Sequence, residues 1–98
     1  MMILHILNCP PGDGQASAQA LAAMAAEDAL LLIEDGVYAV LDAGWEGHRL
    51  DVGRLYALED DLAARGLGSR AHERNIETVS MEAFVALTAR ARQTVSWY

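Results

Sequence analysis

Cys9 is the one cysteine of the sequence and the residue whose type fits sulfur or redox chemistry. It follows a short apolar segment, residues 3–7, and precedes a turn-forming stretch of proline and glycine, residues 10–14. A cysteine near a helix N-terminus gains thiolate character, and the thiolate is the form that accepts sulfur. An isolated cysteine is, on the other hand, often a small buried apolar side chain. Cys9 is therefore a candidate sulfur acceptor, with an inert thiol as the alternative.

A second group of candidates, Glu34, Asp35 and Gly36, directly follows the apolar run 29–33. The run does not alternate with polar residues, which is typical of a central parallel strand that helices cover on both faces. Ligands and partners usually meet such a sheet at the carboxyl ends of its strands. Asn8 ends the earlier apolar segment, so we expect it to share this edge as part of a partner or pocket surface. The simpler interpretation is an acidic turn before a helix.

The same placement bears on Cys9. If the strands at 3–7 and 29–33 are neighbours, the carboxylates of Glu34 and Asp35 lie near the thiol. Negative charges raise the pKa of a thiol and so reduce its thiolate fraction. We therefore expect that Cys9 is not an obligatory sulfur carrier.

The other polar residues give weaker signals. Gly12 and Gly14 follow a strand, but the third glycine of a dinucleotide-binding loop is missing. His5 lies inside an apolar run, which favours a core or interface histidine over a catalyst. One cysteine and three scattered histidines do not give the spacing of a zinc site, so we expect no metal and no cofactor.

Length and charge narrow the classes of function. The 98 residues are 53% hydrophobic, and we expect them to form one domain over residues 1–98. The net charge of −7 makes direct binding of a nucleic-acid backbone an unfavourable interpretation. No apolar run approaches the roughly 20 residues of a membrane span, and no basic segment precedes the first apolar run. We expect no membrane association and a cytoplasmic location.

The elements that would position the candidates alternate along the chain. We expect strands at residues 3–7, 29–33, 54–58, 76–79 and 94–98. Helices are expected at 16–26 with Ser17 as its candidate cap, at 37–41, at 59–65 before Gly66, and after the cap Ser80. Residues 42–53 are expected to be a long connection that hides part of a helix, and residues 67–75 a polar loop. This alternation predicts a three-layer α/β/α domain with a five-stranded, mostly parallel sheet.

Five blocks of the sequence share a pattern with a known family. They are LHILNCPP at 4–11, DALLLIEDGVYA at 28–39, LYALEDDLAARGL at 55–67, AFVALT at 83–88 and VSW at 95–97. In this order, over nearly the whole chain, they resemble the DsrH/TusB family. The resemblance implies a DsrEFH-like fold and a place as the small third subunit of a cytoplasmic sulfur-relay complex.

The resemblance also implies partners and a division of labour. In a complex of TusBCD type, sulfur passes as a persulfide toward 2-thiolation of the wobble uridine in tRNA, and the persulfide cysteine sits on a sister subunit. The implied role is an accessory subunit, non-catalytic by itself, in a hetero-oligomer with DsrE/TusD-like and DsrF/TusC-like chains. The isolated chain is then a candidate homo-oligomer.

Two alternatives stay open. The first is a DsrH-like subunit of a DsrEFH sulfur-oxidation relay, with Cys9 as the sulfur acceptor. Subunits of that kind can carry a cysteine in or near the first helix, whereas residues 16–26 contain none here. The second is a stand-alone α/β domain that binds a small ligand with the loops after the strands at 3–7 and 29–33.

Overall fold

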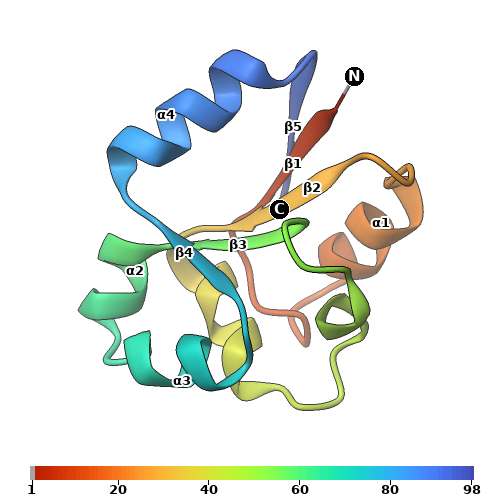
Figure 1. The fold of residues 1–98 in the computed structure, drawn as a ribbon. Helices are drawn as coiled ribbons and strands as arrows, with labels where there is room; N and C mark the ends of the chain where they lie inside the picture. Colours follow the sequence, from red (N-terminus) through yellow and green to blue (C-terminus); the bar gives the residue numbers. More distant parts are fainter. Residues whose placement is uncertain (1) are drawn as a thin grey trace.

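The computed structural model describes residues 2–98 and contains a five-stranded sheet in the order β4-β3-β2-β1-β5 (Figure 1). The strands are β1 (Ile3–Leu7), β2 (Ala29–Leu32), β3 (Leu55–Leu58), β4 (Glu77–Val79) and β5 (Gln93–Trp97). All four pairings are parallel. The expected five-stranded parallel α/β sheet is therefore confirmed, and the first strand lies inside the sheet between β2 and the last strand.

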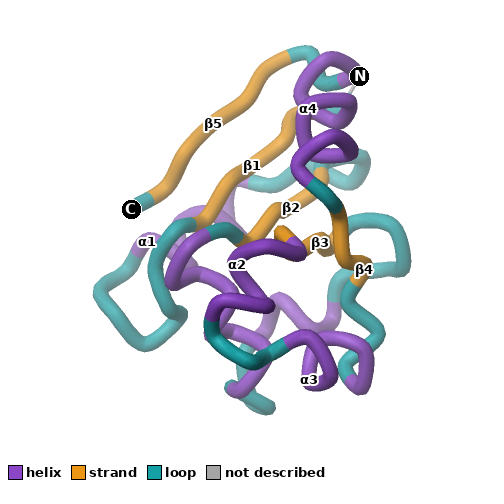
Figure 2. Tube along the Cα trace, turned by 90° about the vertical axis from the view of Figure 1, so that its left-hand side faces the viewer, coloured by secondary structure: helices purple, strands orange, loops and turns teal. Residues whose placement is uncertain are grey.

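Helices cover the two faces of the sheet unequally (Figures 1 and 2). They are α1 (Ala16–Ala23), the 3-10 helices η1 (Glu34–Leu41) and η2 (Glu46–Arg49), α2 (Glu59–Ala64), α3 (Gly68–Glu73) and α4 (Met81–Arg90). Residues of α1, η1, α2 and α3 join one apolar core cluster. Among the described residues, α4 is the helix that contributes to the cluster on the other face. Within residues 2–98, no helix has both the length and the apolar character that a membrane crossing demands.

The first helix ends at Ala23, three residues before the end that the alanine-rich sequence predicts. The backbone N–H of Ala25 donates instead to Asp28 Oδ2 at 2.9 Å. The Ala25 carbonyl accepts from Asp28 N and from the Arg54 guanidinium. These contacts hold Ala25 outside the helix, so the local hydrogen bonds with Asp28 and the long-range bond from Arg54 outweigh the helix propensity of alanine here.

Two further expectations were wrong. Residues 67–75 are not a polar loop, because α3 forms where Leu67 and Ala71, four residues apart, are both buried. Ser17 is not the cap of α1, since it lies inside the helix and its hydroxyl accepts from Trp45 Nε1 at 2.7 Å. The hidden helical part expected in residues 42–53 is η2.

Two predicted helix ends are confirmed. Gly66 has a φ of 67°, and its N–H and that of Leu67 donate to the carbonyls of Ala63 and Leu62. This is the glycine-dependent termination that closes the free carbonyls of a helix end. At the start of α4, the Ser80 hydroxyl accepts from Ala83 N at 3.1 Å.

A buried carboxylate ties the start of the sheet together. Asp28 is 1% exposed, and its oxygens accept from Ile3 N at 3.0 Å, Ala25 N at 2.9 Å and His5 Nε2 at 3.1 Å. On its other side, His5 Nδ1 lies 3.1 Å from Trp97 Nε1. An indole N–H can only donate, so Nδ1 must accept and the proton of a neutral His5 sits on Nε2. His5 is thus a core histidine, as expected, in a hydrogen-bonded chain Trp97–His5–Asp28 that runs from β5 across β1 to the residue before β2.

Asp28 makes the free energy of unfolding depend on pH in the acidic range. Burial raises the pKa of Asp28, but the hydrogen bonds from Ala25, Ile3 and His5 outweigh it and hold the pKa below the ordinary value of 3.8. Its stabilisation is therefore present above pH 3.8 and is lost as pH falls through the lower folded pKa. In Asp28→Asn, we expect a smaller free energy of unfolding at pH 7, because each buried donor left unpaired costs roughly 1–3 kcal/mol.

Urea unfolding at pH 7 and pH 3 checks this prediction. The wild type should lose stability between the two values, whereas the Asp28→Asn variant should lose less. Asp51→Asn, at an exposed carboxylate, is the matched control and should behave as the wild type. An acid loss in Asp28→Asn equal to that of the wild type would contradict the assignment.

Candidate functional site at the carboxyl edge of the sheet

Gly36 joins the carboxyl ends of β1 and β2. The strands end in register, with Leu7 opposite Leu32, and Ile33 N then donates to the Leu7 carbonyl at 3.0 Å. A Cβ at Gly36 would overlap that carbonyl oxygen and would lie 3.4 Å from the Cα of Asn8. The structure therefore brings Asn8 and Gly36 together, as expected, and Gly36 allows η1 to cross the end of β1 at backbone contact.

Asp61 of α2 holds the turn at Glu34. Glu34 has a φ of 49°, a conformation that costs a residue other than glycine about 1–3 kcal/mol. Its backbone N–H donates to Asp61 Oδ2 at 2.6 Å, while its own side chain is exposed. The hydrogen bond to a carboxylate offsets part of the strain and fixes where Glu34 points.

Asp35 is neutralised by Arg65 rather than free. Its Oδ1 accepts from Arg65 Nε at 3.1 Å and from Nη2 at 2.9 Å. Arg65 also donates to the Asp61 carbonyl and lies 5.8 Å from the centre of the Tyr38 ring. The edge thus presents a mixed patch of charged and aromatic groups. Sequence reasoning missed this ion pair because its partners lie 30 residues apart, beyond any local spacing rule.

Cys9 lies in the loop after β1 and is half-buried against the apolar core cluster that α1, η1, α2 and α3 join. Burial raises the pKa of its thiol, and the nearby carboxylate of Asp13 raises it further. The direction of the shift is as expected, but the cause is not, because the contributing carboxylate is Asp13 rather than Glu34 or Asp35. The thiolate fraction at neutral pH is consequently low, and the thiol is not activated.

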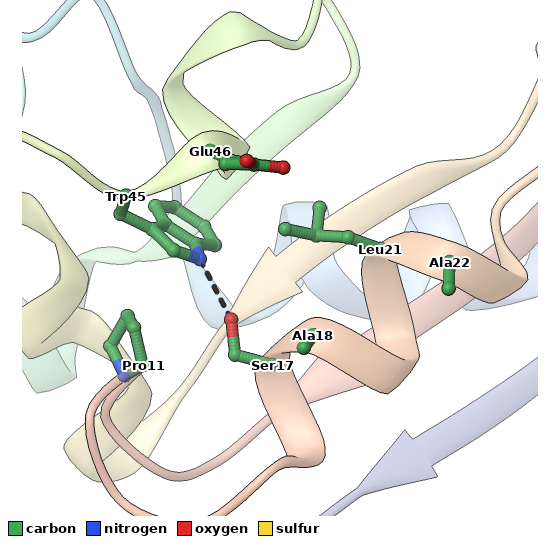
Figure 3. A pocket seen from close by; sticks show the side chains of 7 residues that line it. All are labelled: Pro11, Ser17, Ala18, Leu21, Ala22, Trp45 and Glu46. Carbon is green, nitrogen blue, oxygen red and sulfur yellow. Dashed lines mark hydrogen bonds between the residues drawn. The ribbon is translucent and has the colours of Figure 1, made fainter.

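A cavity of about 360 Å³ opens between α1 and the chain around Trp45 (Figure 3). Its lining residues are Pro11, Ser17, Ala18, Leu21, Ala22, Trp45 and Glu46. The buried hydrogen bond between Trp45 and Ser17 fixes one wall, and the Trp45 ring packs directly on Gly47, where a Cβ would overlap it. Sequence reasoning missed this cavity, because residues 42–53 lack the periodicity that would place Trp45 against α1.

The carboxyl edge of the sheet combines paired charges with exposed apolar side chains. Across residues 2–98, no three or more histidine, cysteine, aspartate or glutamate side chains are grouped to hold a metal ion. The thiol of Cys9 has a raised pKa, and Asp35 at the edge pairs with Arg65, whereas the Glu34 side chain is exposed. Beside them on η1, Tyr38, whose ring faces the Arg65 guanidinium, and Leu41 are 38% and 46% exposed. Paired charges beside exposed apolar side chains are common where one protein binds another.

Comparison with known proteins identifies the family to which the chain belongs. The sequence model of the DsrH-like protein family matches residues 11–94. A Protein TusB from Pectobacterium atrosepticum is 34% identical over 97 residues, covering 97% of this chain and all of the relative. Proteins TusB from Serratia proteamaculans and Yersinia pestis are 46% and 38% identical, covering 74% and 72% of this chain and 78% and 76% of the relatives. The chain therefore belongs to the DsrH-like family.

Proposed function

We propose that this protein is an accessory subunit of a cytoplasmic sulfur-relay complex of TusBCD type, which acts in 2-thiolation of the wobble uridine of tRNA. The observation that carries the proposal is the match to proteins named TusB over the full length of a relative. Its partners are a DsrE/TusD-like and a DsrF/TusC-like subunit, and the sulfur-carrying cysteine belongs to one of them.

The state of Cys9 supports the accessory role. A sulfur carrier needs an accessible thiolate, whereas Cys9 is half-buried and its thiol pKa is raised. Helix α1, where DsrH-like sulfur acceptors can lie, contains no cysteine. The chain therefore contributes surface to the relay rather than a covalent intermediate.

The carboxyl edge supplies the surface for partner chains. Tyr38 and Leu41 of η1 expose apolar side chains. The Arg65 guanidinium, held by Asp35, lies over the Tyr38 ring. The net charge of −7 disfavours direct contact with the phosphates of tRNA, so that contact falls to other members of the relay.

Two other functions remain candidates on specific observations. A DsrEFH sulfur-oxidation relay would use Cys9, and dissimilatory sulfite reductase genes beside this one would favour it. A stand-alone ligand-binding role would use the cavity beside Trp45, whose walls are mostly apolar. If the protein has that role, a small apolar compound should bind in the cavity and change the tryptophan fluorescence. In Ala18→Phe, whose larger side chain fills part of the cavity, this change should be lost.

The first test is assembly. Co-expressed with DsrE/TusD-like and DsrF/TusC-like chains, the tagged protein should co-purify with them and elute as one complex in size-exclusion chromatography. Leu41→Asp should weaken this association, because it puts a charge into the apolar patch. Val52→Asp, at a side chain 94% exposed, should not. A monodisperse monomer in the presence of those chains would contradict the complex, whereas assembly unaffected by Leu41→Asp would contradict only the location of the surface.

The second test concerns Cys9. In Cys9→Ser, we expect unchanged folding, partner binding and sulfur transfer by the assembled complex, because the wild-type thiol is mostly protonated. Mass spectrometry after incubation with a persulfide donor should find no stoichiometric gain of about 32 Da on Cys9, the mass of one sulfur atom. Asp13→Asn, which removes the charge that raises the thiol pKa, should speed alkylation of Cys9 by iodoacetamide. A full adduct together with an inactive Cys9→Ser complex would favour the DsrEFH-type relay instead.

A further inference from the structure

The outward face of α4 exposes apolar side chains to water. The helix directs Ala83, Phe84 and Leu87 toward the apolar core cluster on the face of the sheet that α4 covers. On the opposite side, six residues are exposed: Met81, Glu82, Val85, Ala86, Ala89 and Arg90. Met81 is 49% and Val85 59% exposed. Figures 1 and 2 both show α4 as the outermost element on its side, with no other described segment over it.

The two charges on this face are placed symmetrically about Ala86. Glu82 lies four residues before Ala86 and Arg90 four residues after it. At 1.5 Å per residue, they are about 12 Å apart along the helix axis. Within residues 2–98, neither charge has an ion-pair partner. Each is therefore available for an opposite charge from outside the chain.

We propose that the outward face of α4 binds a second copy of this chain, with the two helices antiparallel and a two-fold axis at Ala86. In this arrangement Glu82 of each copy lies opposite Arg90 of the other, which makes the face complementary in charge to itself. Ala86 and Ala89 let the helices approach closely, while Val85 and Met81 cover the apolar seam.

The size of the face sets the strength of the dimer. A stable interface buries about 800 Å² on each partner, and a ten-residue helix only about 15 Å long supplies less than that. We therefore expect a weak dimer that forms at high protein concentration. Its two exposed ion pairs make it weaken as salt rises.

Charge exchange tests the pairing. Sedimentation velocity of the purified chain from micromolar to millimolar concentration should show a reversible monomer–dimer equilibrium. Glu82→Arg and Arg90→Glu should each weaken it about tenfold or more, since each turns two attractions into repulsions. The double variant Glu82→Arg with Arg90→Glu should restore it, and Ala86→Arg should abolish it. Glu73→Arg, at an exposed glutamate of α3, is the matched control and should leave it unchanged.

Cross-linking tests the symmetry axis independently. In a Cys9→Ser background, Ala86→Cys places a thiol beside its own copy, within the roughly 3.8 Å between Cβ atoms that a disulfide needs. Mild oxidation should link these chains into dimers, whereas Ala63→Cys, exposed on α2, should not. Thermal unfolding of each variant verifies that it is folded. A chain that stays monomeric throughout, or a dimer that the α4 variants leave unchanged, would overturn the proposal.

Discussion

The buried carboxylate of Asp28 is the constraint on which the arrangement of the strands depends. Its two oxygens fix the start of β1 through Ile3, the exit from α1 through Ala25, and the interior of β1 through His5. The Arg54 guanidinium donates to the carbonyls of Asp28 and Ala25 and so attaches the start of β3 to the same point. Removing a charge from water is costly unless it is fully hydrogen-bonded, so these segments are held together by the need to satisfy one anion.

At the opposite end of the sheet, the positions of the residues depend on the close approach of two backbone segments. Because Gly36 has no side chain, η1 can lie directly on the Leu7 carbonyl, and this fixes where Glu34 and Asp35 leave the sheet. Asp61 of α2 and Arg65, at the C-terminal end of that helix, then hold those two residues by hydrogen bonds. The backbone at Glu34 and the carboxylate of Asp35 are therefore both held by hydrogen bonds from the α2 region, and the exposed Tyr38 and Leu41 follow them on the same helix, η1.

The three inner strands β1, β2 and β3 could be predicted from the sequence because each is a short apolar run that a polar segment follows. The edge strands β4 and β5 are mostly polar and could be predicted only from the alternation of strands and helices along the chain. Local chemistry also predicted the helix end at Gly66 and the cap at Ser80. What the sequence could not reveal depends on distant partners. Arg54, 29 residues from Ala25, contributes to the early end of α1, and Trp45, 28 residues from Ser17, binds the hydroxyl that was expected to cap that helix. At the candidate site, the edge residues were predicted, but the Asp35–Arg65 pair and the influence of Asp13 on Cys9 are tertiary properties.

The hydrogen bond between Trp97 and His5 joins residues 92 positions apart, and it has a consequence for synthesis of the chain. A ribosome releases β1 first and β5 last, yet β1 lies between β2 and β5 in the finished sheet. Throughout translation, one side of β1 is therefore an open edge, with apolar Leu4, Ile6 and Leu7 next to unpaired backbone groups. Such an edge invites pairing with other chains. This side of β1 stays open to wrong partners until β5 has been synthesised, and β5, which is mostly polar, then covers β1 and becomes the edge strand.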